Sequence, residues 1–363
     1  MKKILFTGGG SAGHVVPNLA LIRDLKKTGG YDISYLGSDG IEKNLVSGAD
    51  IPFYEISCPK LVRSFTLKNL TIPFSLFKAV REAKKILRKL KPDLVFSKGG
   101  YVSLPVCLAA AKEKIPVLTH ESDLSAGLAT KLVAGKCRRV LTSFPETAEK
   151  FKNGKFTGSP LRAELFDYAD KAEAKKRFPS LRGKPTILAF GGGSGAAAIN
   201  RAVFENLGEL LKRYDVLHIV GKNNADSAPK RAGYASFEYI GNMGEAYACA
   251  DLVIARAGSN TLFELAALKL PALIVPLCRG SRGDQAENAA YFQNRGLIRV
   301  VDEKRLTSDL VKQTDAAIND SELRAALKKS PFAKSGNAAI LSEIKSAING
   351  ANRANGANRE SGA

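Results

Sequence analysis

One local pattern occurs twice in this chain of 363 residues: an apolar run, a glycine-rich turn and then a helix-like stretch. The first copy is KKILFTGGGSAGHVVPNLALIRDL at 2–25, and the second is PTILAFGGGSGAAAINRAVFENL at 185–207. Such a turn points backbone N–H groups and the positive end of a helix at one place, which suits a phosphate or another anion. The repeat therefore predicts two nucleotide-fold domains that face a common cleft.

Apolar runs alternate with helix-like stretches along the rest of the chain. The runs are rich in Val, Ile and Leu without polar alternation, which is typical of parallel strands covered on both faces. They are ILFT, ISYLG, DLVFS, PVLTH and RRVLTSF in the first half, and TILAFG, VLHIVG, LVIAR, ALIVPL and LIRVV in the second. The predicted fold class is α/β, with two Rossmann-like doubly wound domains and a C-terminal helical segment.

The length of the chain suits two domains better than a single hydrophobic core. We place the boundary near TGSPLR, or within the polar stretch AEAKKRF that precedes the second glycine turn. The predicted domains are 1–160 and 161–335, followed by a helix at 336–349. The last segment, 350–363, carries no large apolar residue, so it is predicted to be disordered.

The net charge of +20 is distributed unevenly along the chain. Residues 1–160 carry 26 basic and 13 acidic side chains, a net +13, whereas 161–363 carry 29 and 22, a net +7. Such an excess favours a polyanionic partner, which charge alone leaves open among nucleic acid, an anionic membrane surface and a phosphorylated lipid. Without an apolar run near the length of a membrane span or a signal peptide, the sequence predicts a cytosolic protein.

The cysteines and histidines give no metal pattern. The five cysteines show neither metal-ligand nor redox spacing, and there are only three histidines, so we expect reduced thiols and no zinc site.

Residues 70–91 predict a basic amphipathic helix, with seven basic side chains and one acidic one from Lys78 onward. One interpretation is a helix that covers the sheet and keeps a solvated charged face. The other is contact of its apolar start, residues 72–77, with a membrane surface. Both interpretations can hold for different turns of the helix.

The first glycine turn fits G-x-G-x-x-G at Gly8, Gly10 and Gly13, a pattern that by itself suggests NAD or FAD. In a dinucleotide-binding fold, an acidic residue at the end of the second strand holds the ribose. Asp39 comes two residues too late for that position, so the NAD or FAD interpretation has weak support. His14 lies at the mouth of the turn, where an imidazole could act as a general base or donate to a phosphate. The alternative is a histidine that caps or packs the helix.

Two further motifs of the first half end predicted strands. KGGYVSLP at 98–105 opens a helix with a glycine pair, and THESD at 119–123 ends the next strand. His120, Glu121 and Asp123 are thus expected at the carboxyl edge of the sheet, where open α/β folds bind ligands. Acid or base roles follow for Glu121 or Asp123, and the alternative is a helix N-cap at this point.

The segment ADLVIARAGSNTLFELAALKLPALIVPL carries the densest signal of the second half. Ser259, Asn260 and Thr261 are predicted in the first turn of a helix, where hydroxyl, amide and N–H groups can hold a diphosphate. Glu264, one turn further, can accept both hydroxyls of a ribose. A capping box with Thr261 is the alternative for this glutamate. The loop 279–289 follows the next strand and can close over a sugar.

Taken together, seven motifs in one order resemble the MurG family of GT-B glycosyltransferases, over residues 2 to about 345. They are GGGSAGH, KGGYVSLP, HESD with AGL, GSPLR, GGGSGA, RAGSNTLFELAA and DQAENA. The family joins N-acetylglucosamine (GlcNAc) from UDP-GlcNAc to lipid-linked N-acetylmuramoyl-pentapeptide.

The resemblance implies a donor site in the second domain, with Ile240 beside the uracil, Glu264 on the ribose and Gln285 on the sugar. It also implies His14 and Glu121 as catalytic residues, with His14, Glu121 and Asp123 as the candidates for the base. The implied acceptor or membrane contacts are Ile72, Phe74, Phe77 and Tyr101. The implied donor contacts are Ser11, Ala12, Gly13, Asp123, Arg162, Gly193, Ser194, Ile240, Ser259, Asn260, Thr261, Leu262, Phe263, Glu264 and Gln285.

The chain departs from the family pattern at two places. HESD stands where the family commonly has His-Glu-Gln-Asn, so Asp123 replaces an asparagine that contacts the donor sugar, and a carboxylate can accept but not donate a hydrogen bond. Gly193 stands where a serine is common, with Ser194 one place on.

The resemblance implies an inverting transfer of GlcNAc to the C4 hydroxyl of undecaprenyl-diphospho-N-acetylmuramoyl-pentapeptide, with UDP-GlcNAc as a substrate and neither a cofactor nor a metal. It also implies a peripheral protein on the anionic cytoplasmic face of the cell membrane. The alternatives are another GT-B enzyme, such as a glycolipid glycosyltransferase or a UDP-GlcNAc 2-epimerase, and a nucleotide-binding module for nucleic acid. Aromatic residues are not interleaved with the basic clusters, which argues against nucleic acid.

Overall fold

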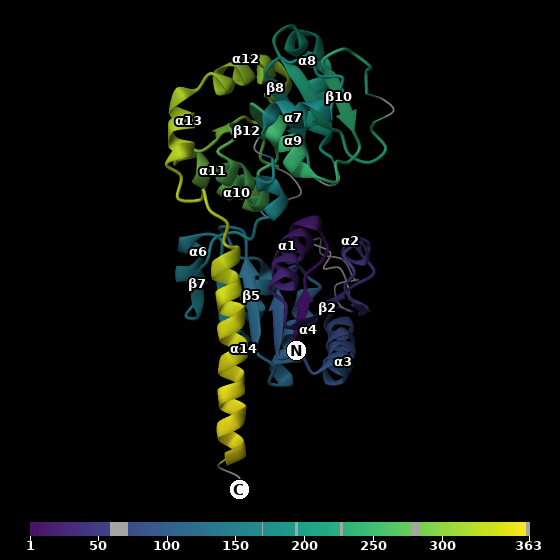
Figure 1. Cartoon of the computed structure of the whole chain (residues 1–363), viewed down its shortest axis with the longest axis vertical. Helices are drawn as coiled ribbons and strands as arrows, with labels where there is room; N and C mark the ends of the chain where they lie inside the picture. The colour runs from purple at the N-terminus through teal and green to yellow at the C-terminus, as the bar shows by residue number, and fades with distance from the viewer. Residues whose placement is uncertain (59–71, 169, 193–194, 226–227, 278–282, 361–363) are drawn as a thin grey trace. The chain divides into compact units, whose positions relative to one another are not determined.

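The computed structural model describes residues 1–58, 72–168, 170–192, 195–225, 228–277 and 283–360, with the backbone alone for 351–360. The chain divides into two compact units (Figure 1). The first unit comprises Met1–Pro160 together with Ser335–Ala363, and the second comprises Leu161–Lys334. Each unit is built on its own parallel sheet, because the apolar strands alternate with helices that cover them.

The sheet of the first unit has the order β3-β2-β1-β4-β5-β6-β7, and its recorded strand pairs are parallel. Its strands are β1 (Lys2–Thr7), β2 (Tyr31–Gly37), β3 (Phe53–Glu55), β4 (Leu94–Ser97), β5 (Val117–Glu121), β6 (Arg139–Thr142) and β7 (Gly154–Phe156). Its helices are α1 (Ala12–Thr28), α2 (Ile41–Ser47), α3 (Ile72–Leu90), α4 (Ser103–Lys112), α5 (Leu128–Val133), η2 (Ala134–Lys136), α6 (Pro145–Glu149) and α14 (Asn337–Glu360).

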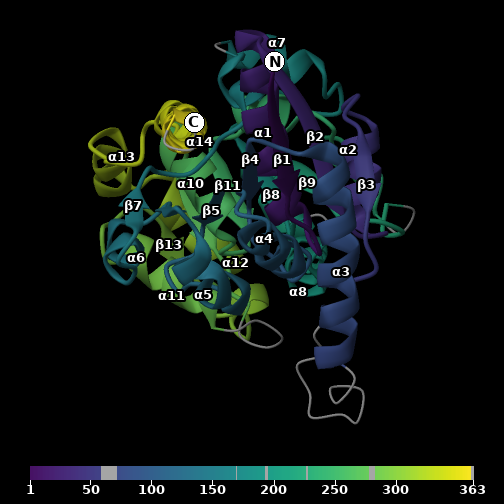
Figure 2. The same ribbon diagram turned by 90° about the horizontal axis from the view of Figure 1, so that it is seen from below.

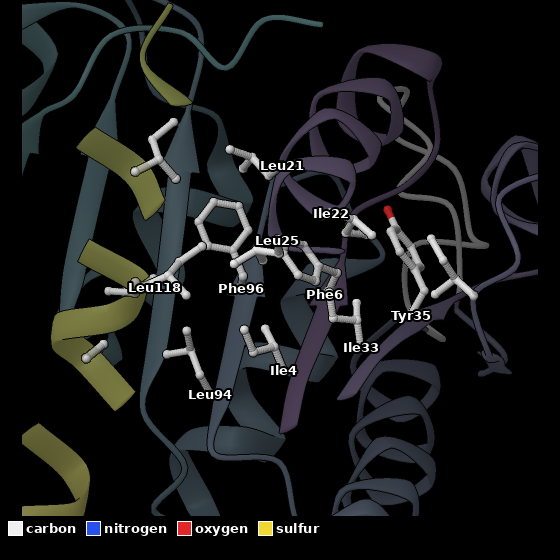
Figure 3. Packing of buried hydrophobic residues seen from close by; sticks show 14 of the residues in the cluster. Ile4, Phe6, Leu21, Ile22, Leu25, Ile33, Tyr35, Leu94, Phe96 and Leu118 are labelled. Atoms are coloured by element: carbon white, nitrogen blue, oxygen red, sulfur yellow. The ribbon is translucent and has the colours of Figure 1, made fainter. Parts of the chain in front are cut away.

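Successive side chains of a strand point to opposite faces of the sheet, so neighbouring residues of β1 belong to different hydrophobic cores. Phe6 shares a core with Leu21 and Leu25 of α1, and the centroid of its ring lies 5.3 Å from that of Phe96 (Figure 3). Leu5 instead joins the core formed by α3, α4 and the sheet. On this second face α4 packs against both α3 and α5 (Figure 2). The sheet is therefore covered on both sides, which explains its unbroken apolar strands.

Helix α14 belongs to the first unit, although it lies at the end of the chain. Ile340, Ile344 and Ile348 are each at most 2% exposed and join the core that contains β1 and α1. The side-chain amide of Asn337 donates to Asp24 of α1 at 2.7 Å.

The described end of the chain differs from the sequence prediction. Helix α14 continues to Glu360, whereas disorder is predicted from residue 350. The packed turns before this stretch remove the cost of nucleating a helix, so the helix can continue through it.

The sheet of the second unit has the order β10-β9-β8-β11-β12-β13, also with parallel pairs. Its strands are β8 (Thr186–Phe190), β9 (Asp215–Ile219), β10 (Tyr234–Phe237), β11 (Leu252–Ala255), β12 (Ala272–Ile274) and β13 (Arg299–Val300). Its helices are η3 (Ala163–Phe166), α7 (Lys171–Lys176), α8 (Ala197–Arg213), α9 (Met243–Cys249), α10 (Ser259–Leu268), α11 (Asp284–Gln293), α12 (Leu306–Ile318) and α13 (Ser321–Lys328).

Three short strands do not come from any predicted apolar run: β3, β7 and β10. Each lies at an edge of its sheet. An edge strand has a single neighbour and less burial, so it does not need the continuous Val, Ile and Leu of a central strand.

None of the helices in the described part of the chain is long and apolar enough to cross a membrane.

Candidate active site

The strand order of the first unit reverses between β1 and β4, which are hydrogen-bonded neighbours. At such a switch point the loops that leave the carboxyl ends of the two strands diverge and open a crevice. His14 lies in the first turn of α1, directly after the loop that follows β1; Lys98 and Tyr101 lie in the loop after β4, and β5 ends at Glu121. The fold thus brings three motifs that are far apart in the sequence to one edge of the sheet.

The first glycine turn is held by side chains behind it. Gly10 donates its backbone N–H to the buried carboxylate of Glu42 at 3.1 Å. The hydroxyl of Tyr35 donates to the carbonyl of Gly8 at 2.7 Å, and the amide of Asn18 donates to the carbonyl of Thr7 at 3.1 Å. These contacts fix the turn that precedes His14. The sequence analysis missed Glu42, because its importance depends on a turn more than thirty residues away.

The imidazole of His14 is oriented by a contact with the backbone of Lys98, the residue that follows β4. Its Nδ1 lies 3.0 Å from the carbonyl oxygen of Lys98. Because a carbonyl only accepts, Nδ1 carries the proton, and in the neutral ring Nε2 holds the lone pair. The glycine pair makes this approach possible, since a Cβ on Gly100 would lie 3.0 Å from Cδ2 of His14 and 2.3 Å from the carbonyl oxygen of Gly9.

The electrostatic surroundings favour a neutral His14. Burial lowers its pKa, and the nearby Lys98 ammonium lowers it further, while Glu121 and Asp123 act in the opposite direction. The helix-capping alternative for His14 is wrong, because Ser11 is the N-cap of α1. A neutral imidazole with its lone pair on Nε2 can accept a proton from a hydroxyl.

Glu121 holds the loop that follows β5. Its buried carboxylate accepts hydrogen bonds from the N–H groups of Ser122 at 3.0 Å, Asp123 at 3.2 Å and Gly127 at 2.9 Å. The hydroxyl of Thr130 donates to it as well, at 2.7 Å. A carboxylate whose oxygens already accept four hydrogen bonds suits a positioning role better than proton transfer.

The helix-capping alternative for HESD is also wrong. Helix α5 begins at Leu128, with Gly127 as its N-cap, rather than directly after Asp123. Residues 122–127 therefore form a loop that Glu121 ties together.

Lys98 is a charged residue that the sequence analysis did not single out. Its side chain is 2% exposed, and its ammonium donates to the hydroxyl of Ser122. Burial lowers its pKa to about 8, against the opposing effect of Glu121 and Asp123. The signal for it was present, since a lysine directly after a predicted central strand is placed at the sheet edge.

The remaining predicted residues of the first unit are on its surface or at its edge. Ser11 and Gly13 are exposed, and Ala12 is half-buried. The ring of Tyr101 covers Gly10, where an added Cβ would come within 2.5 Å of it. On α3, Phe74 is 77% exposed and Phe77 is 60% exposed, while Ile72 is half-buried.

The second unit has its own switch point, between β8 and β11. The second glycine turn follows β8 and the Ser259 turn follows β11, so the topology puts both at the carboxyl edge of this sheet. Gly193 and Ser194 lie outside the described residues. Helix α10 begins at Ser259, as predicted, and its N-cap is Gly258.

Glu264 is the centre of a buried polar network in this unit. Its Oε1 accepts from Nη2 of Arg162 at 3.0 Å, and its Oε2 accepts from the hydroxyl of Tyr247 at 2.9 Å. Burial opposes the charge of Arg162, but Glu264 outweighs it and raises the pKa of the guanidinium. The capping-box alternative with Thr261 is wrong, because α10 has begun two residues before Thr261. Tyr247 is a member that the sequence analysis missed.

The other predicted donor residues occupy different depths. Leu262 and Phe263 are 0% and 2% exposed, so only their backbone can contact a ligand. Ile240 is buried in the loop after β10, and Ser259 is also buried. Gln285 is half-buried in the first turn of α11 and accepts from the backbone N–H of Leu277 at 3.0 Å. Asn260 and Thr261 are half-buried at the start of α10.

Among the residues with described side chains, no three His, Cys, Asp or Glu groups gather as metal ligands.

The sequence matches two family descriptions. Residues 4–142 match the glycosyltransferase family 28 N-terminal domain, and residues 186–344 match the glycosyltransferase family 28 C-terminal domain. The first match covers strands of the first sheet, and the second match covers the strands of the second sheet.

Relatives cover most of the chain. An enzyme of Clostridium botulinum (strain Langeland) is 47% identical over 312 residues, which cover 84% of this chain and 88% of the relative. One of Clostridium perfringens (strain SM101) is 46% identical over 315 residues, covering 85% and 88%. Both are named UDP-N-acetylglucosamine–N-acetylmuramyl-(pentapeptide) pyrophosphoryl-undecaprenol N-acetylglucosamine transferase.

The fold has solved counterparts. The crystal structure of MurG from Acinetobacter baumannii has a TM-score of 0.73 and 26% identity, and it covers 95% of this chain and all of its own. The order of the motifs, the two parallel sheets and the similar proteins all indicate the same family. The chain belongs to glycosyltransferase family 28 and, within it, to the MurG family.

Proposed function

We propose that this chain transfers GlcNAc from UDP-GlcNAc to the C4 hydroxyl of undecaprenyl-diphospho-N-acetylmuramoyl-pentapeptide, with inversion at the anomeric carbon. The observation that carries the proposal is the 47% identity over 84% of the chain to an enzyme of that name. A match of 312 residues is longer than either unit, so it spans parts of both. The residues at the edge of the second sheet suit donor binding, and those at the edge of the first sheet suit the proton transfer.

The donor is assigned to the second unit. The diphosphate is expected at the start of α10, where backbone N–H groups and the hydroxyls of Ser259 and Thr261 gather at the positive end of the helix. The ribose is assigned to Glu264, since each carboxylate oxygen has a second lone pair beyond those that serve Arg162 and Tyr247. The amide of Gln285 is assigned to the sugar.

The proton of the acceptor is assigned to His14. Its Nε2 accepts the proton of the C4 hydroxyl while the hydroxyl oxygen attacks the anomeric carbon of GlcNAc. The bond from that carbon to the diphosphate oxygen breaks, and UDP leaves with the electron pair. Attack from the face opposite UDP gives the β linkage. Glu121, with its carboxylate held by four donors, positions the adjoining loop.

The negative charge on the leaving UDP needs a stabilising partner. The N-terminus of α10 and the guanidinium of Arg162 provide positive charge at this edge of the second unit. The proposal therefore uses neither a metal nor a cofactor.

The test of the proposal is transfer from labelled UDP-GlcNAc to a lipid-linked muramoyl-pentapeptide. His14→Ala is expected to lower kcat by about 100-fold or more, the range of general base catalysis, while the Kd for UDP stays near that of the wild type. Glu149→Ala, at an exposed position in the last turn of α6, serves as the control in the same first unit.

Two results would contradict the proposal. Absence of transfer by the wild type, together with binding of a different UDP-sugar, would indicate another GT-B enzyme. Loss of UDP binding in His14→Ala would make His14 structural and leave the base unassigned.

The acceptor is a diphospholipid, so the enzyme must work at a membrane surface. Phe74 and Phe77 are exposed at the start of α3, and basic residues follow them on the same helix. Such a surface suits the interface of an anionic leaflet, where each Lys or Arg contributes about 1 kcal/mol. We place the protein at the cytoplasmic face of the cell membrane, as a peripheral protein.

A further inference from the structure

Lys98 has no part in the transfer as described above, although it lies at the switch point of the first unit. Its carbonyl orients His14, and its side chain is buried at the same place. A buried ammonium is costly unless neighbouring groups compensate its charge. The compensating groups come from the HESD segment, where this chain departs from the common family pattern.

The contacts of Lys98 join two strand ends. Its ammonium donates to the hydroxyl of Ser122, and the backbone N–H groups of Ser122 and Asp123 both donate to Oε1 of Glu121. The lysine side chain thus ties the end of β4 to the loop after β5. A glutamine at residue 122 would present a longer side chain than the serine that meets this ammonium.

Several charged or titratable groups face this ammonium. His14 lies on α1, Glu121 ends β5, and Asp123 is in the following loop. His120 of β5 is the fourth; burial and Lys98 hold its pKa well below the usual range, and its Nε2 donates to the carbonyl of Gly158 at 3.0 Å. Burial lowers the pKa of His14 and the ammonium of Lys98 lowers it further, while the two carboxylates raise it.

We propose that Lys98 is a positioning residue of the reaction centre: its buried ammonium fixes the 121–127 loop through Ser122, while its carbonyl orients the imidazole of His14 with the lone pair on Nε2. The positive charge of the ammonium also favours the neutral form of that imidazole. This inference rests on the proposed function, in which His14 is the base.

The first test measures His14 directly, without any substrate. In Lys98→Met the opposing cation is gone while both carboxylates remain, so the pKa of His14 is expected to rise by about one unit or more. An NMR titration of the histidine side chains reports this, with the His14 signals assigned from a His14→Gln variant. Lys98→Gln provides a second neutral side chain in case the methionine variant does not fold.

The second test uses the pH dependence of transfer. The base must be neutral, so a raised pKa removes activity below that pKa and restores it above. The acid limb of kcat/KM is therefore expected to move to higher pH in Lys98→Met, with about a tenfold loss for each unit below the new pKa. In Lys98→Arg the positive charge remains, so the acid limb of kcat/KM should lie near that of the wild type.

Ser122→Ala separates the effect of the hydrogen bond between Lys98 and Ser122 from the effect of the Lys98 charge. It keeps the ammonium but removes its acceptor, so transfer is expected to fall at every pH without movement of the acid limb. Lys112→Met, an exposed lysine in the last turn of α4, is the matched control and should leave both readouts unchanged.

The outcomes separate this inference from the proposed function. If folded Lys98→Met keeps the wild-type pKa of His14, the role of Lys98 is overturned even when transfer is measured. If the pKa rises but the wild type transfers no GlcNAc, the proposed function fails and the electrostatic role stands. A lower plateau with an unmoved acid limb in Lys98→Met would reduce Lys98 to a structural residue.

Discussion

At the scale of single residues, Glu264 combines structure with a proposed binding role. Both of its oxygens accept hydrogen bonds inside the second unit, from Arg162 and from Tyr247. Burial, with Glu264 as a further cause, raises the pKa of Tyr247 well above its usual value, so the phenol remains a donor. The carboxylate is thus fixed in position before any ribose could bind.

Loss of this carboxylate is expected to cost stability as well as binding. Glu264→Ala leaves the guanidinium of Arg162 buried without its anion, which destabilises a protein by about 3–5 kcal/mol. Urea unfolding measures this difference, and titration with UDP should show weaker binding. Adding Arg162→Met should recover part of the lost stability, because the unpaired charge is then gone.

A matched control is Glu209→Ala, which breaks an exposed pair with Lys212 and should change the unfolding free energy by less than about 1 kcal/mol. Equal effects of Glu264→Ala and Glu209→Ala would contradict the role given to burial.

At the scale of the element, α3 has a buried part and an exposed part. Its later turns bury Val80, Ala83 and Leu87 against the sheet and α4, whereas Phe74 and Phe77 remain exposed at its start. The sequence predicted this division as two compatible interpretations. The burial of the later turns is confirmed, and the contact of the start with a membrane stays a prediction.

The double variant Phe74→Ser/Phe77→Ser tests that contact. Each phenylalanine contributes about 1.5–3 kcal/mol when fully buried, so partial insertion of two rings predicts at least about tenfold weaker retention on anionic liposomes. Co-sedimentation at low salt measures retention. Phe166→Ser, 47% exposed on the second unit, is the control. Unchanged retention of the double variant would remove α3 from the membrane surface.

At the scale of the whole molecule, the last helix of the chain, α14, packs into the core of the first unit. Ile340, Ile344 and Ile348 complete the core around β1 and α1, so residues 1–160 alone lack part of their hydrophobic core. The tail beyond residue 350 is not needed for these contacts.

Truncation separates the two parts of α14. A chain ending at residue 336 is expected to lose about 5 kcal/mol or more of unfolding free energy, because three buried isoleucines are removed. A chain ending at residue 350 should unfold close to the wild type. Calorimetry of both chains measures the difference, and similar melting temperatures would show that α14 does not stabilise the first unit.

The sequence by itself determined the two parallel α/β sheets and the placement of His14, Glu121 and Ser259 at strand ends or helix starts. Periodicity, glycine turns and apolar runs are local, so they can be read without knowing what lies opposite in space. Only the tertiary structure decided which unit receives α14, which nitrogen of His14 carries the proton, and that Lys98 meets Ser122 and Arg162 meets Glu264. Each of these depends on residues that are distant in the chain and meet only when the parallel strands are placed side by side.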